Sequence, residues 1–405
     1  MLHKLSVLTV GVALLLLAAN VRGVAQTAAE SPANREIDAA FVASHNLDHD
    51  QALGHARQAV RLDPDNSRTH RALASVIWLD LLYWRGGMTV DSFLGNLSSM
   101  QLNLPKPDAQ LADEFKGAVN RAIELAEKRL KQRASDVDAM YDTGAAYGVL
   151  ASYIASIEGS VTGAFRHAKR AFELHNEVLK RDPKRASAGI VVGGYRYVIA
   201  SQPVVVQWFA FLAGFAGDKG KAIALLEQAS HDPSSRVDGK TALVLIYSRE
   251  GRHTEAMRLA GELAAELPDN RMFVLEQGSA AIRAGHKDSE AILTRGIAQF
   301  EKDKRPKLPG ERALWFYKRG LSRLNLNRPP DATAADLRQA LASSPEAWVE
   351  GRTRVALGQL ADLAGRRAEA VTEYTKAKAI CGDRDQMCAQ ESRKFLKQPF
   401  TFEHR

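Results

Sequence analysis

The sequence predicts an all-α protein, an α–α superhelix of helical hairpins with one apolar helix inserted into it. Three observations support this fold class. No stretch alternates apolar and polar residues with the period of two that a half-buried β-strand shows. Small residues recur at fixed offsets within windows of about 34 residues. Residues 197–217 carry no charged side chain but contain Pro203, which a continuous helix cannot accommodate.

The N-terminus has the features of a cleaved signal peptide over residues 1–25. A basic residue at position 4 precedes an apolar run, and Gly23 and Ala25 occupy the positions that a signal peptidase reads. We therefore expect a mature protein that begins near Gln26 and is periplasmic or secreted. An uncleaved membrane anchor is the alternative, although the apolar run is short for a spanning helix.

Length and charge restrict the remaining chain to broad classes. The full sequence has 405 residues and a net charge of +8, and removal of Lys4 and Arg22 with the signal peptide lowers this charge to +6. This mild excess gives no argument for nucleic acid as a partner. We expect one TPR-like helical repeat domain over 26–405, with irregular long-helix units over 66–233, regular units over 237–384 and a C-terminal cap over 385–405.

The clearest repeat occupies residues 351–384. Gly358, Gly365, Ala370 and Tyr374 stand at positions 8, 15, 20 and 24 of this window. Small residues at positions 8 and 20 allow the two helices of one unit to approach closely, and the bulky residue at 24 seats the next unit. The pattern resembles the tetratricopeptide repeat (TPR), a helix–turn–helix unit.

Weaker copies of the pattern occur elsewhere. In residues 237–270, Gly251 and Ala256 stand at positions 15 and 20, and a degenerate copy with Gly278 and Gly285 follows directly. Another copy begins at Ala33. Among the irregular units, helices are expected over 68–84 and 108–133, and both helices of the unit over 137–183 should be longer than usual by about two turns.

The middle of the chain resembles one particular TPR family. The runs ASYIASIEGSVTGAFRHAKRAFELHNEVL and VVVQWFAFLAGFAGDKGKAIALLEQAS, with a turn over 214–218, are similar to eukaryotic mitochondrial outer-membrane and inclusion-body-clearance TPR proteins. The resemblance covers roughly residues 140–250 and implies no catalytic residues. The first 130 residues and the signal peptide depart from that family, so its cellular role is not carried over.

The apolar segment supplies the candidate binding residues. A helix should end near Ser201, and a new one should run over 203–213 and pack inside the superhelix; shallow docking on a membrane or partner is the alternative. Aromatic and basic residues often anchor interfaces, but aromatics at helical spacing also occur in cores. The candidates are Tyr195, Arg196, Tyr197 and Trp208.

Peptide-binding positions also follow from the repeat register, because TPR grooves often use positions 2, 5, 9, 12 and 13 of the first helix. In the unit over 237–270 these are Asp238, Thr241, Leu245, Ser248 and Arg249. In the unit over 351–384 they are Arg352, Val355, Gln359, Asp362 and Leu363. Neither set has the Lys/Asn arrangement that grips a C-terminal carboxylate in chaperone-binding TPR proteins.

The sequence motifs predict a protein that is not an enzyme and that binds no cofactor or metal. Phosphate-binding loops, HExxH, GxSxG and dinucleotide fingerprints are absent from it. His45, His49 and His55 lie near carboxylates, but the repeat register puts this cluster at a turn, where we expect solvated side chains. Cys381 and Cys388 can form a disulfide if the helix breaks at Gly382.

These observations favour an exported, non-enzymatic TPR scaffold that binds a protein or peptide partner and no nucleic acid. The alternative is an accessory subunit of an envelope transport system, part of a membrane-associated complex, that presents a solute or a solute-binding protein.

Overall fold

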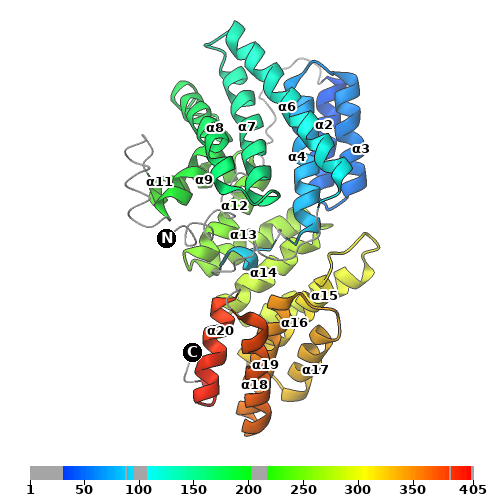
Figure 1. The fold of residues 1–405 in the computed structure, drawn as a ribbon, viewed down its shortest axis with the longest axis vertical. Helices are drawn as coiled ribbons and strands as arrows, with labels where there is room; N and C mark the ends of the chain where they lie inside the picture. Colours follow the sequence, from blue (N-terminus) through cyan, green and yellow to red (C-terminus); the bar gives the residue numbers. More distant parts are fainter. Residues whose placement is uncertain (1–30, 87–88, 95–106, 202–216, 383–384, 403–405) are drawn as a thin grey trace. The chain divides into compact units, whose positions relative to one another are not determined.

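The computed structural model describes residues 31–86, 89–94, 107–201, 217–382 and 385–402, and within these ranges it contains helices and no strand (Figure 1). The predicted all-α class and its TPR-like helical hairpins are confirmed. In chain order the helices are α2 (Pro32–His45), α3 (His49–Leu62), α4 (Ser67–Trp84), α5 (Asp91–Leu94), α6 (Ala109–Gln132), α7 (Val137–Ser156), α8 (Val161–Arg181), α9 (Ala188–Ala200), α11 (Lys219–His231), α12 (Arg236–Arg249), α13 (His253–Glu266), α14 (Arg271–Arg283), α15 (Ser289–Lys302), α16 (Glu311–Asn325), α17 (Pro330–Leu341), α18 (Ala347–Leu363), α19 (Arg367–Cys381) and α20 (Gln386–Lys397).

Contacts divide the chain into two compact units. The first comprises Met1–Arg85 and Asn103–Ile246, and the second comprises Gly86–Leu102 and Tyr247–Arg405. The second unit is therefore discontinuous in sequence, because it takes up a segment that lies between α4 and α6 of the first.

The first unit is built from long helices around α4, of which 15 of 18 residues are buried. α4 packs on α6 and α7, and α7 pairs with α8. Trp78 of α4 is 0% exposed and donates from Nε1 to Ser156 Oγ at 2.9 Å. Phe115 of α6 stacks on Tyr153 of α7, with ring centroids 3.8 Å apart. The predicted lengthening is confirmed: α7 and α8 have 20 and 21 residues, whereas α12 and α13 have 14 each.

The second unit contains the regular hairpins, α14 with α15, α16 with α17 and α18 with α19. Position 8 serves close approach as predicted: a Cβ added to Gly358 would lie 2.5 Å from the Tyr374 ring. The turn residues Gly251 and Gly365 have φ of 75° and 72°, a region that suits glycine. Ala370, at position 20, is 0% exposed.

The hairpin of α16 and α17 is a repeat that the sequence patterns do not identify. Gly320 corresponds to position 8 of the repeat, because a Cβ added there would lie 2.7 Å from the Leu337 side chain of α17. The turn residue equivalent to Gly365 is Asn327, with φ of 52°. Asparagine tolerates the left-handed region better than most residues, so the turn survives without its glycine.

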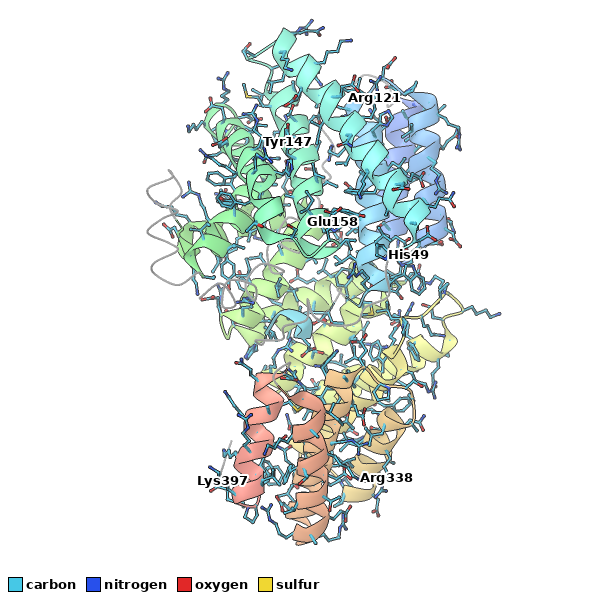
Figure 2. The ribbon with its side chains drawn as sticks, in the orientation of Figure 1. His49, Arg121, Tyr147, Glu158, Arg338 and Lys397 are labelled. Atoms are coloured by element: carbon cyan, nitrogen blue, oxygen red, sulfur yellow. A yellow bond between two sulfur atoms is a disulfide. The ribbon has the colours of Figure 1, made fainter. Side chains whose placement is uncertain are left out.

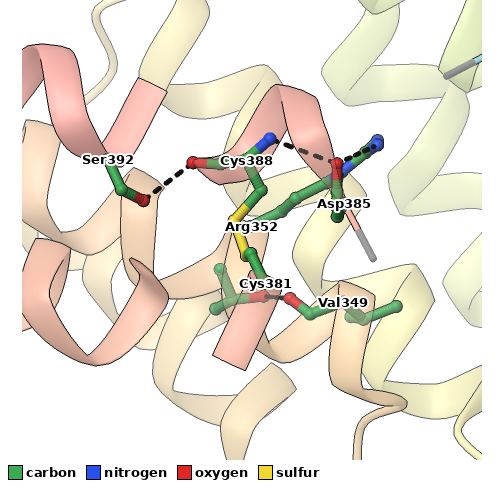
Figure 3. Close-up of a disulfide and its surroundings, with 7 residues drawn as sticks. Val349, Arg352, Cys381, Asp385, Cys388 and Ser392 are labelled. Atoms are coloured by element: carbon green, nitrogen blue, oxygen red, sulfur yellow. Dashed lines mark hydrogen bonds and ion pairs between the residues drawn. A yellow bond between two sulfur atoms is a disulfide. The ribbon is translucent and has the colours of Figure 1, made fainter. Parts of the chain in front are cut away.

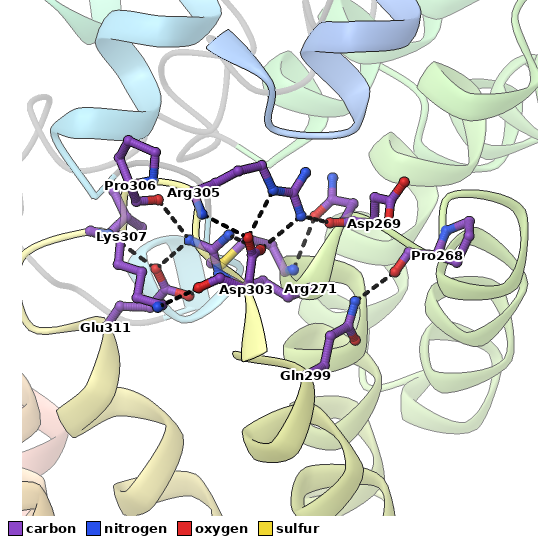
Figure 4. A network of polar contacts seen from close by, with 12 residues as sticks. Pro268, Asp269, Arg271, Gln299, Asp303, Arg305, Pro306, Lys307 and Glu311 are labelled. Carbon is purple, nitrogen blue, oxygen red and sulfur yellow. Dashed lines mark hydrogen bonds and ion pairs between the residues drawn. The ribbon is translucent and has the colours of Figure 1, made fainter. Parts of the chain in front are cut away.

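A buried ionic network fixes the loop between α15 and α16 (Figure 4). Arg271, at the start of α14, is 0% exposed. Its Nε lies 2.7 Å from Glu311 Oε1, and its Nη1 lies 2.8 Å from Asp303 Oδ2. Its Nη2 also donates to the Pro306 carbonyl at 3.1 Å. All three nitrogens of this guanidinium thus have acceptors, two of which are carboxylates that balance its buried charge.

A disulfide between Cys381 and Cys388 joins the end of α19 to α20, with 6.0 Å between the two Cα atoms (Figure 3). Helix α19 ends at Cys381, and Gly382 follows with a positive φ of 49°. Helix α20 lies in the expected C-terminal cap, where Phe395 and Phe400 pack with Tyr374 and cover the last hairpin.

The predicted insert lies outside the described residues, and so do the helix over 203–213 and Trp208. Its borders are described and agree with expectation: α9 ends at Ala200, and Asp218 caps α11 by accepting from the Lys221 N–H at 2.9 Å. None of the helices in the described ranges combines the length and the apolar character that a membrane crossing requires.

Candidate functional site: a charged groove in the second unit

The aromatic candidates of α9 lie mostly within the core of the first unit. Tyr195 and Tyr197 are 5% and 2% exposed. Arg196 is half-buried, and its guanidinium carbon lies 5.9 Å from the centroid of the Phe172 ring. Their role in partner binding stays a prediction.

The histidine cluster does not converge on one point. His45 Nε2 lies 3.4 Å from Asp238, His49 Nδ1 lies 3.0 Å from Asp80, and His55 Nδ1 lies 2.7 Å from Glu36. The turn placement holds, since α2 ends at His45 and α3 begins at His49, which Figure 2 labels. The expected solvation is wrong for His49, whose side chain is only 13% exposed because it packs on Tyr83 and pairs with Asp80.

Among the described residues, one group has the spacing of a metal site, namely Cys381, Asp385 and Cys388. The disulfide occupies both sulfur atoms. Asp385 accepts from Arg352 Nε at 2.6 Å and caps α20 through the Cys388 N–H at 3.1 Å (Figure 3). The arrangement therefore serves as a structural junction of α18, α19 and α20.

The second unit holds a cavity of about 630 Å³ that is lined by α20 and by the first helix of each of three hairpins, α14, α16 and α18. We call this cavity the groove. Arg352, Val355 and Gln359, three of the five positions predicted in the unit over 351–384, line it. Asp362 does not, because it binds Arg367 and the Tyr374 hydroxyl, which donates at 2.9 Å.

Helices α14 and α16 line the groove through corresponding positions. Ser279, Ile282 and Arg283 stand at positions 9, 12 and 13 when Arg271 is position 1. Tyr317, Leu321 and Asn325 stand at positions 5, 9 and 13 when Gly320 is position 8. The repeat register thus predicts these residues once both degenerate copies are recognised.

Residues 89–94 border the groove, and Asp91 and Leu94 line it. Thr89, Val90 and Asp91 are 4%, 8% and 5% exposed. The Val90 N–H donates to Glu276 Oε1 at 2.9 Å. The Asp91 carboxylate accepts from Lys318 Nζ at 2.6 Å, and Arg283 Nη1 lies 3.4 Å away. Sequence patterns do not reveal these contacts, because 227 residues separate Asp91 from Lys318.

Burial and charge oppose each other in this cluster. Burial alone would raise the pKa of the Asp91 carboxyl, but the Lys318 ammonium and the Arg283 guanidinium hold it well below its usual value. Burial, and then the charge of Asp91, raise the pKa of Glu276 to about 7. Burial also lowers the pKa of Lys318, which the Asp91 carboxylate partly offsets. The Asp91–Lys318 pair is therefore a dry ion pair in which each partner depends on the other.

Two polar atoms at the groove wall have no hydrogen-bond partner among the described residues. They are Ser279 Oγ, on a side chain 1% exposed, and Arg283 Nε. His286 also lines the groove, but its Nδ1 accepts from the Asp288 N–H at 3.3 Å, and Ser279 lacks the base contact that nucleophilic activation needs. The wall therefore offers hydrogen bonds and charge for binding.

The groove combines apolar area with charged side chains. Four cations line it (Arg283, Lys318, Arg352 and Lys394) beside two carboxylates (Asp91 and Glu391), and three of these cations are paired, Lys318 and Arg283 with Asp91 and Arg352 with Asp385. Apolar walls come from side chains that include Leu94, Val355, Met387 and Phe395. This mixture suits an extended peptide that carries apolar and acidic side chains.

Comparisons with known proteins find similar solved structures only at low sequence identity and low TM-score. No protein-family model matches the sequence, and no curated protein matches it. Similar solved structures include yeast Tom70, with 12% identity, TM-score 0.37 and coverage of 89% of this chain and 87% of that one. Human IFIT1, in a dimer with m7Gppp-AAAA, has 14% identity, TM-score 0.44 and coverage of 97% and 85%. A tetratricopeptide repeat protein from Parabacteroides merdae has 10% identity, TM-score 0.29 and coverage of 89% and 98%. These TM-scores are low, so the hairpin architecture rests on the chain's own helices and contacts.

Proposed function

We propose that this protein is an exported, non-enzymatic scaffold that binds a protein or peptide partner through the groove of its second unit. One observation carries the proposal: first-helix positions of three consecutive hairpins converge on a single cavity of about 630 Å³. A peptide laid across these hairpins would meet equivalent side chains at each step. The lysine and arginine side chains of the groove favour acidic partners.

The proposed location outside the cytoplasm is supported by two features. Residues 1–25 have the pattern of a signal peptide. The Cys381–Cys388 disulfide suits an oxidising compartment, whereas disulfides are rare in the cytosol. N-terminal sequencing of exported protein should give a chain that begins near Gln26; an intact Met1 in the membrane pellet would contradict the cleaved signal.

The binding proposal is tested by affinity capture of the mature protein from envelope extracts, with partners identified by mass spectrometry. Met387 lines the groove and is 45% exposed. Leu363 is 36% exposed and does not line it. Met387→Glu places a negative charge in the groove mouth and should abolish partner capture, whereas the matched control Leu363→Glu should retain it.

Both variants should melt within about 2 °C of wild type, since exposed substitutions have small effects on stability. Equal capture by Met387→Glu and wild type would overturn the groove as the binding site. A transporter or solute-binding protein among the captured partners would favour the transport role instead.

A further inference from the structure

Residues 89–94 border the groove but do not belong to the hairpins that form it. Helices α14, α16, α18 and α20 all belong to the C-terminal part of the chain, and each hairpin packs on its neighbours. The 89–94 segment comes from between α4 and α6, which pack together in the first unit. It therefore meets the groove as a separate piece of chain, in the way that a bound peptide would.

The contacts of this segment are those of a ligand. Its backbone is bound through the Val90 N–H, which donates a hydrogen bond to Glu276. One side chain, Asp91, inserts between Lys318 and Arg283. Backbone recognition combined with one charged anchor is a general mode of peptide binding.

The segment fills only part of the site. The adjoining cavity of about 630 Å³ is lined by Asp91 and Leu94 and by side chains of α14, α16, α18 and α20. Ser279 Oγ and Arg283 Nε stand at the wall of this cavity with unused hydrogen-bonding capacity. The groove thus offers more binding surface than residues 89–94 cover.

We propose that residues 89–94 are a built-in competitor for the groove, and that the partner is an acidic peptide segment whose carboxylate replaces that of Asp91. This inference rests on the proposed function and specifies the chemistry of the partner. The Lys318 side chain is 4% exposed, so whatever displaces Asp91 must supply a negative charge. A neutral segment would leave this ammonium buried without a counter-charge and would be rejected.

The groove lining restricts which side chains the partner carries near its carboxylate. The cavity that adjoins Asp91 is lined by the apolar side chains of Leu321, Val355 and Phe395 and by Lys394. A segment in which apolar residues lie near an aspartate or glutamate fits this lining. Such a segment gains the empty part of the groove in addition to the site of Asp91, which allows it to win against a competitor held in the same chain.

The test uses the full mature chain and a fluorescein-labelled peptide with the sequence of residues 86–94, GGMTVDSFL, followed by fluorescence anisotropy. Asp91→Asn removes the charge that anchors the internal segment and leaves Lys318 and Arg283 in place. We expect this variant to bind the peptide at least tenfold more tightly than wild type. The same peptide with Asn in place of Asp should bind at least tenfold more weakly.

Two controls make the result specific. Asp113→Asn makes the same chemical change at an exposed position of α6 and should behave like wild type. Lys318→Met added to Asp91→Asn should remove peptide binding. The proposal is overturned if Asp91→Asn binds the peptide no better than wild type, or binds the Asp and Asn peptides equally.

A second measurement covers the case in which Asp91→Asn fails to fold. Here the wild-type chain, which keeps the Asp91–Lys318 pair, is mixed with an excess of the Asp peptide, and the backbone amides of residues 89–94 should exchange hydrogen faster as the peptide displaces them. Absence of a peptide-dependent rise in exchange would show that the segment is a permanent packing element.

The two proposals fail in different ways. Partner capture that depends on Met387 but is unchanged by Asp91→Asn would overturn the competitor alone. Partner capture that is unchanged by Met387→Glu would overturn the groove as the partner site.

Discussion

The two units differ in how much of a comparable helix they bury. Helix α4 of the first unit buries 15 of its 18 residues, including Arg71 and Asp80. Helix α18 of the second unit buries 9 of its 17 residues and presents Arg352 and Gln359 to the groove. Both helices pack on several neighbours, α4 on α2, α3, α6 and α7, and α18 on α16, α17, α19 and α20. The difference is that α18 also borders the groove, and a helix face that borders a cavity is available for recognition.

The largest effect that separates the two units should come from Trp78→Ala. Trp78 is 0% exposed, so truncation should lower the free energy of unfolding by about 3–5 kcal/mol. Chemical denaturation of the mature chain measures this loss. Met387→Ala in the groove should change stability by less than about 0.5 kcal/mol, and a similar cost for both variants would erase the distinction between core and groove.

Removal of the disulfide should have the next largest effect. The Cys381→Ser, Cys388→Ser double variant should lose about 2–3 kcal/mol, because a bridge across this short loop restricts the unfolded chain. Thermal melting with and without a reducing agent checks the value: reduced wild type should match the double variant. A variant as stable as the oxidised protein would show that α20 docks without the bridge.

Overpacking of the last repeat should cost somewhat less. Ala370→Leu adds bulk at a position that is 0% exposed, which should destabilise the protein by about 1–3 kcal/mol. The comparison is Ala368→Leu, two residues earlier on the same helix at an exposed position, which should be nearly neutral. An unchanged melting temperature for Ala370→Leu would show that the repeat register is wrong there.

The smallest effect should depend on pH and report on the groove cluster. Burial and Asp91 raise the pKa of Glu276 from an ordinary 4.5 to about 7, so the native state binds this proton more tightly than the unfolded state. Wild type should therefore lose stability as pH rises from about 4.5 through 7. Glu276→Gln keeps the carbonyl that accepts from Val90 and removes the ionisation.

At pH 8 Glu276→Gln should be more stable than wild type by about 1–2 kcal/mol, and at pH 4 the two should be alike. Glu124→Gln, at a side chain 65% exposed, is the matched control for the chemical change itself. Parallel stability curves for Glu276→Gln and wild type from pH 4 to 8 would contradict the raised pKa.

Local patterns in the sequence predict the regular hairpins well. The turn at Gly251 and the close approach at Gly358 follow from residue size and backbone freedom, which are local properties. The α16–α17 hairpin is missed because Asn327 replaces the turn glycine. With that one substitution recognised, Tyr317 and Leu321 follow as groove residues.

The charged anchor of the groove could not be predicted in the same way. Asp91 reads as a loop residue, and Lys318 stands at a position that repeat rules leave unassigned. Their pairing depends on tertiary contact between distant segments, which no periodicity encodes. For the same reason Tyr195 and Tyr197 look like binding aromatics in sequence, although the first unit buries both.

The discontinuous second unit limits how the protein can be dissected. A fragment that starts at Tyr247 lacks Asp91 and keeps Lys318 at a site where water is excluded. Breaking a buried ion pair in this way costs about 3–5 kcal/mol, a large share of the stability of an ordinary domain. A single genetic cut therefore does not release this half intact. Gene fusions and truncations have to carry residues 86–102 along with it, and an insertion between α4 and α6 alters both halves at once.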